Sequence, residues 1–507
     1  MNSGRLCIGL DLGTSGMKGV ALASDGAVAA RAQAAYPTSR PVSRAAEQDT
    51  ADWIQATEAV LQALAHQSDV ADWLGIGLSG MLPTLVTLDS GAAANGAAVT
   101  WEDGRADLQG DRLRNSVGAE HIYRATGQWL DGRYLLPMFQ RLAEEEPDRA
   151  TNTAAICSAK DYLFSYLTGM LATDPSTAAG FGCYGLESGD WRPEVLAAAD
   201  AQLPGGLPEL PAVLAAKTTR PLKAGVASDL GVPEGLCVCL GAADSVLGAL
   251  GLGVQSDGEV AYVAGTSSVI LGVSSRLAFD PSHRYLVTPM AENGAWGFEM
   301  DLLATGSSLS WLSGVLLESR SPAAVGDMAA DLAPEDAPVF LPYLGGGEQG
   351  ALWNPDLRGS VIGLELRHDR GHIARALLNG IVLESRRCLA VLDEAGLPAS
   401  TIHLAGGSAA VPGFAGELAD ATGRRVSVLA DGDTDSSAAG AAELVARAVP
   451  PAGRAVPRTG PKAPTVIEPD KERTAVWDRL FARHNRALEA VKGFFEDPRE
   501  KEQASEW

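Results

Sequence analysis

The 507-residue chain has few cysteines and no long uninterrupted hydrophobic run. Its six cysteines lie mostly in apolar segments, and Cys237 and Cys239 fall on one face of an expected strand. We therefore expect small buried side chains rather than a disulfide framework or a metal site. The longest uncharged run, residues 395–416, is interrupted by Gly, Pro and Ser. No membrane span is expected.

Positive charge is also scarce, because Lys and Arg total 40 against 63 Asp and Glu, a formal charge of −23. Such an acidic surface repels nucleic acid and anionic lipid, so neither is expected as a partner. A ring of backbone N–H groups can still hold a small polyanion. Asp11 interrupts the apolar run near the N-terminus, which excludes a signal-peptide core and predicts a cytoplasmic protein.

Three familiar site patterns are missing or incomplete. No G-x-x-x-x-G-K-[ST] sequence occurs, which excludes a Walker-type ATPase. Residues 75–80 match the dinucleotide fingerprint, but a strand-like run at 81–88 follows where a helix is required. His368 and His372 have the spacing of helix-borne metal ligands, but Gly371 should break the helix between them. We expect solvated histidines at a helix start.

A strand–turn–strand pattern occurs twice. Residues 6–12 and 17–23 are apolar and flank a Gly-Thr-Ser-Gly turn, and 261–264 and 269–273 flank Gly-Thr-Ser-Ser 252 residues later. This spacing predicts a duplicated domain of about 200–250 residues per copy. Asp11 precedes the first turn where Val263 precedes the second, which predicts one site with unequal halves.

Helical spacing of apolar residues predicts helices over 49–67, 371–396 and 472–495, and the alternation with strands indicates α/β layers. A Pro-rich connector covers about 448–461. The predicted domains are residues 1–254, residues 255–448, and a connector with a C-terminal helix over 449–507.

The two turns suit phosphate binding. A tight Gly-Thr-Ser turn exposes consecutive N–H groups and hydroxyls, and two such turns facing each other can clamp a triphosphate. Asp11 beside one turn suits Mg²⁺ held through water. Phosphoryl transfer further needs a carboxylate to accept the proton of the acceptor hydroxyl. Asp244 is the candidate, and its other role, capping the helix that follows, is compatible with it.

These residues resemble the FGGY-type carbohydrate kinases over residues 6 to about 495, most closely the xylulokinase-like branch. Residues 8–18 and 263–269 resemble the two phosphate motifs, and 240–253 the segment that carries the catalytic base. Further matching landmarks are residues 47–49, 100–105, 160–163, 173–174, 341–343, 354–359 and 404–407.

The resemblance implies a duplicated ribonuclease-H-like fold of the actin/Hsp70 type, with ATP and Mg²⁺ in an interdomain cleft. It assigns the general base to Asp244 and the Mg²⁺ site to Asp11. The residues implied for the nucleotide and its phosphates are Gly13, Thr14, Ser15, Lys18, Gly265, Thr266, Ser267, Gly306, Gly406 and Gly407. Those implied for the sugar are Met81, Leu82, Trp101, Asp103, Arg105, Asp244 and Ser245. Homodimers are frequent in the family, although no decisive interface pattern is found in this sequence.

The sugar-facing positions depart from the xylulokinase pattern. Met81-Leu82-Pro83 replaces Gln-Met-His, and Ser245 replaces an asparagine. In the second half Gln349 replaces an arginine and Ser408 a glycine. A changed buried hydrogen-bonding group alters which hydroxyl pattern is accepted. D-xylulose is therefore one candidate substrate, and ribulose, glycerol and erythritol are others. A catalytically weak sugar-binding sensor is the alternative function.

Overall fold

The computed structural model describes residues 5–292, 294–316, 319, 321–429, 435–449 and 464–495. Its contacts divide the chain into two compact units. The first comprises residues 1–251, 286–297 and 435–460, and the second 252–285, 298–434 and 461–507. In the described ranges every helix is too short or too polar to span a lipid bilayer. The domain boundaries expected from the sequence stay a prediction.

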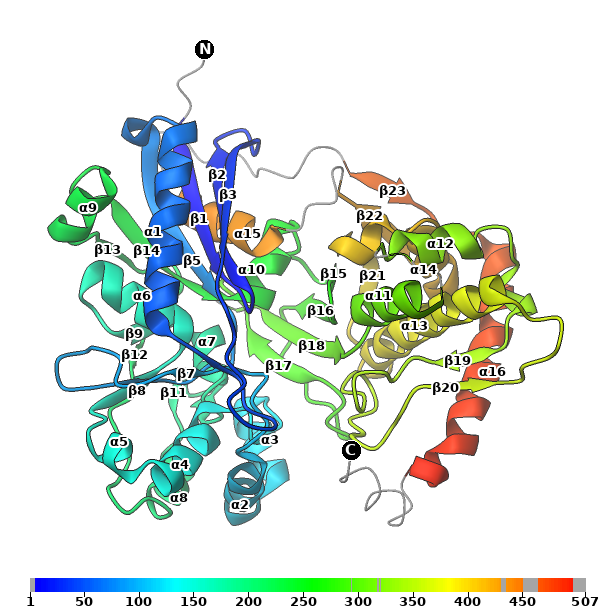
Figure 1. Cartoon of the computed structure of the whole chain (residues 1–507), viewed down its shortest axis with the longest axis horizontal. Coiled ribbons are helices and arrows are strands. Elements are labelled where there is room, and N and C mark those ends of the chain that lie inside the picture. The colour runs from blue at the N-terminus through cyan, green and yellow to red at the C-terminus, as the bar shows by residue number, and fades with distance from the viewer. Residues whose placement is uncertain are drawn as a thin grey trace. The chain divides into compact units, whose positions relative to one another are not determined.

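The first unit is built on a six-stranded sheet with the order β13-β14-β5-β1-β2-β3 (Figure 1). The bounds are β1 Leu6–Leu12, β2 Gly16–Ala23, β3 Val28–Ala35, β5 Trp73–Gly80, β13 Thr219–Pro221 and β14 Cys237–Ala243. Strand β1 pairs with β2 in antiparallel and with β5 in parallel orientation, and β5 pairs in parallel with β14. The predicted first hairpin is confirmed.

The pleat of β1 sends alternate side chains into two different layers. Ile8 and Leu10 share a buried cluster with the apolar face of α1 (Thr50–Gln67). Cys7 points to the other face, into a cluster formed largely by α15 (Ser436–Ala448). Helix α15 thus packs on this first sheet, although the sequence placed its residues in the range of the second domain. Its many alanines let the helix lie close to the sheet.

Smaller elements complete the first unit, and part of them surround a separate apolar cluster. Its short strands are β4 Glu47–Gln48, β6 Val86–Leu88, β7 Ala98–Val99, β8 Ala155–Cys157, β9 Ala172–Thr173, β10 Tyr184–Gly185, β11 Asp190–Trp191, β12 Ala212–Val213 and β17 Leu286–Pro289. Its helices are η1 Val70–Asp72, α2 Asp107–Val117, α3 Ala119–Thr126, α4 Leu135–Glu145, α5 Pro147–Thr151, α6 Ala159–Thr168, α7 Pro175–Ala179, α8 Pro193–Asp200, α9 Ala224–Leu230 and α10 Asp244–Gly251.

The second unit repeats the topology of the first. Its strands are neighbours in the order β18-β16-β15-β21-β22-β23, so in both sheets the first hairpin is followed on one side by two parallel strands and an antiparallel edge strand. The bounds are β15 Gly258–Ala264, β16 Ser268–Ser274, β18 Trp296–Leu302, β21 Ala399–Ala405, β22 Arg425–Val428 and β23 Thr465–Ile467. The predicted second hairpin and the predicted duplication are confirmed.

The remaining elements of the second unit are mostly helical. They are α11 Gly306–Leu316, α12 Ala323–Ala329, η2 Pro334–Asp336, β19 Val339–Leu341, β20 Ser360–Ile362, α13 Arg370–Glu394, η3 Gly407–Ala410, α14 Phe414–Thr422 and α16 Lys471–Phe495. The predicted long helices are confirmed in α1, α13 and α16. Most of the Pro-rich connector lies outside the described residues.

One local expectation is wrong. Helix α13 begins at Arg370 and runs through Gly371 without a break, because the side chain of Asp369 caps its N-terminus by accepting the His372 N–H at 3.2 Å. The histidines nevertheless lie at a helix start, as expected. The ring of His372 forms a hydrogen bond with the side chain of Asp369. All six cysteines are free, and all but Cys237 are buried.

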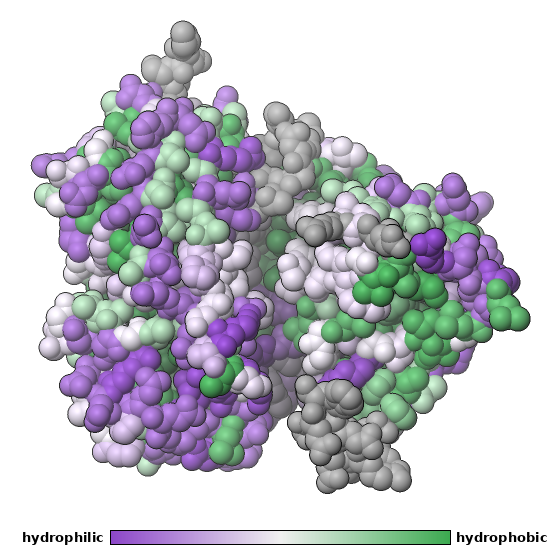
Figure 2. Space-filling model, in the orientation of Figure 1, coloured by the Kyte–Doolittle hydropathy of each residue, from purple (hydrophilic) through white to green (hydrophobic). Residues whose placement is uncertain are grey.

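The two units differ at the surface. Among the described residues, the exposed large hydrophobic side chains of the first unit are Val42 and Leu108. Those of the second are Trp311, Val315, Met328, Leu344, Leu364, Leu366, Val466 and Phe494. Figure 2 shows apolar side chains gathered on the visible face of the second unit, whereas that of the first is mainly hydrophilic.

Candidate active site

Three of the predicted site segments emerge together from the first sheet. Strands β1, β5 and β14 end at Leu12, Gly80 and Ala243, and these residues pair with one another in register. Parallel strands that end at one level place the segments that follow them side by side. The turn at 13–16, residues 81–82 and Asp244 therefore start at one edge of the sheet.

Asp11 lies one residue before the end of β1, between a lysine and a serine. In the strand register it faces Lys18 of β2 on one side and Ser79 of β5 on the other. The Ser79 hydroxyl donates to Asp11 Oδ1 at 2.7 Å. Burial raises the pKa of the Asp11 carboxyl, and the Ser79 hydrogen bond and the Lys18 charge oppose this rise. Asp11 is thus a buried carboxyl group that is held in place at the edge of the sheet.

Side chains from other elements hold the first turn. Gln48 Nε2 donates to the carbonyl oxygen of Thr14 at 2.7 Å, and Trp101 Nε1 donates to its hydroxyl at 3.0 Å. The hydroxyl of Tyr36 donates to the carbonyl oxygen of Gly13. The hydrogen bonds of the described chain leave the N–H groups of Thr14 and Ser15 without a protein acceptor. A held turn with such N–H groups can bind a phosphate oxygen.

Lys18 points to an acidic partner. Its Nζ lies 3.6 Å from Asp435 Oδ1, and Arg31 also contacts this carboxylate at 3.3 Å. Asp435 directly precedes α15. The structure therefore brings Lys18 near the first turn by register but pairs its charge with Asp435.

The second turn is held by a helix. The N–H groups of Thr305 and Ser307 donate to the carbonyl oxygen of Thr266 at 3.2 and 3.0 Å, and that of Gly306 donates to Gly265 at 3.1 Å. A Cβ added to Gly306 would lie only 2.3 Å from the Gly265 oxygen. The start of α11 can approach the turn this closely only because residue 306 is glycine.

Gly406 and Gly407 follow β21 and begin the short helix η3. A cavity of about 500 Å³ adjoins η3 and is lined by Ala409, Val411, Gly413 and Arg473 among others. Glycine at 406 brings this segment against the end of β15, at Ala264. The second unit thus places Gly265, Thr266, Ser267, Gly306 and the pair 406–407 at one edge of its sheet.

Asp244 begins α10 directly after β14 and is partly exposed. Its Oδ1 accepts the N–H of Ser245 at 2.8 Å, and its carbonyl oxygen accepts the hydroxyl of Ser437 at 2.9 Å. Both its backbone and its carboxylate are therefore fixed. Because the carboxylate is partly exposed, a hydroxyl of a bound molecule can reach it.

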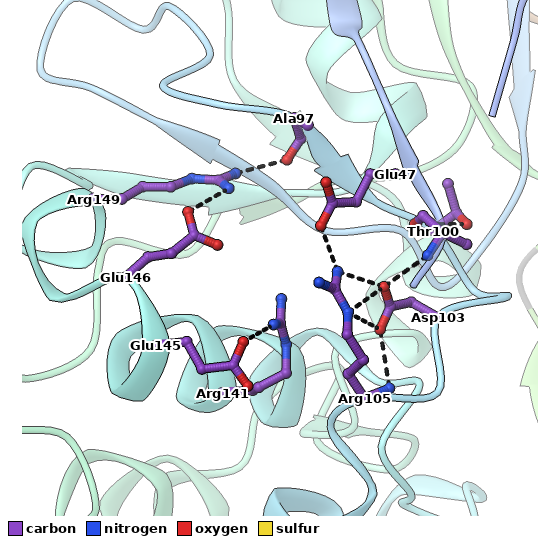
Figure 3. A network of polar contacts seen from close by, with 10 residues as sticks. Glu47, Ala97, Thr100, Asp103, Arg105, Arg141, Glu145, Glu146 and Arg149 are labelled. Carbon is purple, nitrogen blue, oxygen red and sulfur yellow. Dashed lines mark hydrogen bonds and ion pairs between the residues drawn. The ribbon is translucent and has the colours of Figure 1, made fainter. Parts of the chain in front are cut away.

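The predicted sugar residues at 103 and 105 form a compact ion-pair network with Glu47 (Figure 3). Asp103 is buried and accepts the Ala46 N–H at 2.9 Å as well as the Arg105 guanidinium, whose Nη2 lies 2.6 Å away. Burial disfavours its charge, but the Arg105 and Ala46 hydrogen bonds prevail and lower the pKa of Asp103. Arg105 also donates to Glu47 Oε1 at 2.5 Å. The network fixes the segment that carries Trp101.

The remaining sugar candidates are apolar. Met81 is fully buried, and its N–H donates to the carbonyl oxygen of Leu12 at 2.9 Å. Leu82 is partly exposed and packs against the cluster that includes α15. Of the two, Leu82 can contribute to an exposed apolar wall.

Sequence reasoning assigned no role to several residues near the site, namely Tyr36, Gln48, Ser79, Lys160, Asp174 and Ser176, although Gln48, Lys160 and Asp174 lie in the landmark segments 47–49, 160–163 and 173–174. One of them carried a visible signal, because Ser79 is the single hydroxyl in the apolar run 74–80. The others are recognised only by their partners.

Models of the FGGY family of carbohydrate kinases match residues 6–251 with the N-terminal domain and 260–449 with the C-terminal domain. The chain belongs to this family. It is 31% identical to a xylulose kinase of Klebsiella pneumoniae over 445 residues, 87% of this chain and 90% of the relative. It is 30% identical to the Escherichia coli K12 xylulose kinase over 447 residues, 88% of this chain and 90% of the relative.

Solved structures agree. The xylulose kinase of Rhodospirillum rubrum superposes with a TM-score of 0.87 at 30% identity, covering 97% of this chain and all of the other. A Plasmodium falciparum glycerol kinase with ADP, only 16% identical, has a TM-score of 0.84 over 96% of this chain and 98% of the other, which shows the fold alone. The expected actin/Hsp70-like ribonuclease-H-like fold is confirmed. The chain is a sugar kinase, and carbohydrate kinases use ATP.

The residues around Asp11 also fit Mg²⁺. Within the described ranges no group of three His, Cys, Asp or Glu side chains could hold a metal by itself. A single carboxylate beside a phosphate-binding turn suits an ion that keeps most of its water and takes phosphate ligands. The homodimer and the cytoplasmic location stay predictions.

Proposed function

We propose that this kinase transfers the γ-phosphoryl group of ATP to a hydroxyl of a small ketose, with Asp244 as general base. The register of β1, β5 and β14 supports the proposal most strongly, because it starts the first phosphate turn, residues 81–82 and Asp244 at one level. A base, an acceptor and a phosphate must lie within bonding distance of one another for in-line transfer.

In the proposed reaction Asp244 accepts the proton of the acceptor hydroxyl while the oxygen of that hydroxyl bonds to the γ-phosphorus. The bond from that phosphorus to the bridging oxygen breaks, and ADP leaves. Thr14 and Ser15 bind phosphate oxygens through their N–H groups, as do Thr266 and Ser267 in the second unit. Asp11 would hold Mg²⁺ through water, and the bound ion would supply charge neutralisation at the phosphates.

We further propose that Gly265, Gly306, Gly406 and Gly407 let the backbone of the second unit approach the nucleotide. The cavity beside η3 offers space for part of it. Lys18, already paired with Asp435, supplies charge near the phosphates only if ATP competes for it.

D-xylulose is the first candidate substrate, because two relatives at 30–31% identity are xylulose kinases. Trp101, Asp103, Arg105 and Ser245 border the sugar in this proposal, with Leu82 as an apolar wall. Since Met81 and Pro83 replace the glutamine and the histidine of the xylulokinase pattern, another ketose or a polyol is the second candidate.

The test is ADP release with Mg-ATP over D-xylulose, D-ribulose, glycerol and erythritol, for the wild type and Asp244→Asn. We expect one sugar to respond and the variant to lose about 10³-fold in kcat, within the range typical of general bases. Asp369→Asn is the matched control, since it changes an aspartate at another helix start, and should keep wild-type kcat.

Full sugar-dependent activity in Asp244→Asn would refute the base. Silence with every sugar, together with measurable ATP binding, would instead favour the sugar-binding sensor.

A further inference from the structure

Strand β14 is irregular immediately before Asp244. Its pairing with β5 is interrupted between Cys239 and Ala242, so Leu240 and Gly241 form a bulge. Gly241 has a φ of +80°, and a Cβ there would lie 1.6 Å from the Leu78 oxygen. A bulge redirects the chain that follows it. The position of Asp244 therefore depends on how this bulge is held.

Two polar side chains hold the strand on either side of the bulge. Lys160 of α6 donates from Nζ to the carbonyl oxygen of Leu240 at 3.3 Å. Ser176 of α7 accepts the N–H of Ala243 on its Oγ at 2.9 Å. Ala243 is the residue directly before Asp244.

Asp174 links these two contacts. Its Oδ2 accepts the Ser176 hydroxyl at 2.5 Å, and its Oδ1 lies 3.2 Å from Lys160 Nζ. Asp161 gives the ammonium a second partner at 2.8 Å. All four side chains are buried, with Lys160 only 1% exposed. The chain Leu240–Lys160–Asp174–Ser176–Ala243 is thus continuous.

The two carboxylates favour the charged form of Lys160 despite its burial. Burial alone would favour a neutral amine, but Asp161 and Asp174 outweigh it and raise the pKa of Lys160. Buried ion pairs are replaceable by apolar residues where only stability is needed. A buried, ion-paired lysine that donates to a carbonyl oxygen of the bulge indicates that backbone placement is the property it supports.

We propose that Lys160, Asp174 and Ser176 are positioning residues that hold the end of β14, and with it the carboxylate of Asp244, in place for proton transfer. This inference rests on the proposed role of Asp244 as general base. Because these side chains act through Asp244, their loss should slow phosphoryl transfer and leave substrate affinity nearly unchanged.

The test measures the single-turnover rate of phosphoryl transfer, the KM values and the thermal unfolding midpoint. Ser176→Ala should slow transfer about 10–100-fold with both KM values within about threefold, and Asp174→Asn should behave alike. Lys160→Met is a third variant, used if it folds. Ser165→Ala, a buried serine on α6, is the matched control and should transfer at the wild-type rate.

A double mutant separates positioning from general loss of structure. If Ser176 acts through Asp244, adding Ser176→Ala to Asp244→Asn should cause no further loss of rate beyond about twofold. A further loss as large as in the single mutant would overturn the proposal.

The failure of this inference is distinguishable from that of the proposed function. If Asp244→Asn is inactive while Ser176→Ala and Asp174→Asn transfer at the wild-type rate, the positioning role is refuted and the base stands. If Asp244→Asn is fully active, the base itself is refuted and the positioning role with it.

Discussion

The two Gly-Thr-Ser turns occupy equivalent places in two equivalent sheets, but they are held differently. Side chains hold the first, where Trp101 and Gln48 bond to Thr14. The N-terminus of α11 holds the second, through N–H groups that bond to Thr266. The second turn is also one residue shorter, since Ala264 pairs with Ser268 whereas Leu12 pairs with Met17.

The strands beside the turns differ in charge. Asp11 faces Lys18 in the first hairpin, and Val263 faces Val269 at the equivalent place in the second. Both sheets thus carry a Gly-Thr-Ser turn at the equivalent place, but a carboxylate lies beside the first turn and a helix N-terminus beside the second. A fold repeats readily, but the chemistry depends on the few side chains at its edge.

The largest expected effect comes from removing the charge that distinguishes the first turn. Asp11→Asn keeps the size of the side chain but loses the carboxylate that we propose for Mg²⁺, so kcat should fall about 10³-fold. ADP release at saturating ATP and sugar, with Mg²⁺ varied, measures it. Asp25→Asn, in an exposed turn of the same unit, is the control and should keep the kcat of the wild type. Wild-type kcat in Asp11→Asn would remove the proposed asymmetry between the turns.

A smaller effect is expected where the helix meets the second turn. Gly306→Ala places a Cβ 2.3 Å from the Gly265 oxygen and must push α11 away. The KM for ATP should rise about 10–100-fold while that for the sugar stays within about threefold. Gly314→Ala, on the same helix with no atom within 4 Å of the added carbon, is the matched control. Equal KM values in both variants would show that the close approach has no role in binding.

The smallest expected effect is on stability rather than on rate. It follows from a difference between the two units in how a buried acidic side chain is paired. In the first unit Asp174 faces Lys160. In the second, Glu348 accepts the N–H groups of Gln349 and Gly350 at 2.8 and 3.1 Å, and burial followed by repulsion from Glu384 raises its pKa to about 8. Glu384 itself is paired with other groups, namely Arg387, His484 and Tyr343.

Because the folded-state pKa of Glu348 exceeds its ordinary value, its contribution to stability is complete below about pH 4.5 and is lost as the pH rises through about 8. The thermal unfolding midpoint of the wild type should therefore be lower at pH 9 than at pH 6, by about 5 °C. Differential scanning calorimetry measures it. Glu348→Gln, neutral at both values, should show a clearly smaller difference. An equal difference in both proteins would show that Glu348 does not titrate in this range.

Local patterns were sufficient for much of this protein. The alternation of apolar residues and the glycine-rich turns gave both hairpins, and helical spacing gave α1, α13 and α16. The break expected at Gly371 was wrong because α13 begins one residue earlier, after the Asp369 cap, so His368 lies before the helix and His372 in its first turn. The combined motifs also identified the family, since turn chemistry and spacing are encoded in neighbouring residues.

Partner choice was decided only by the tertiary structure. Lys160, Asp174 and Ser176 are separated from Leu240 and Ala243 by more than sixty residues, and only strand register and helix packing bring them together. The same holds for Ser79 with Asp11, and for α15 on the first sheet. The sequence by itself determined both hairpins with their turns, three long helices and the family, because these follow from local periodicity and conformation. The contacts of Lys160, Asp174 and Ser176 near Asp244 depend instead on the register of distant strands, which no local pattern specifies.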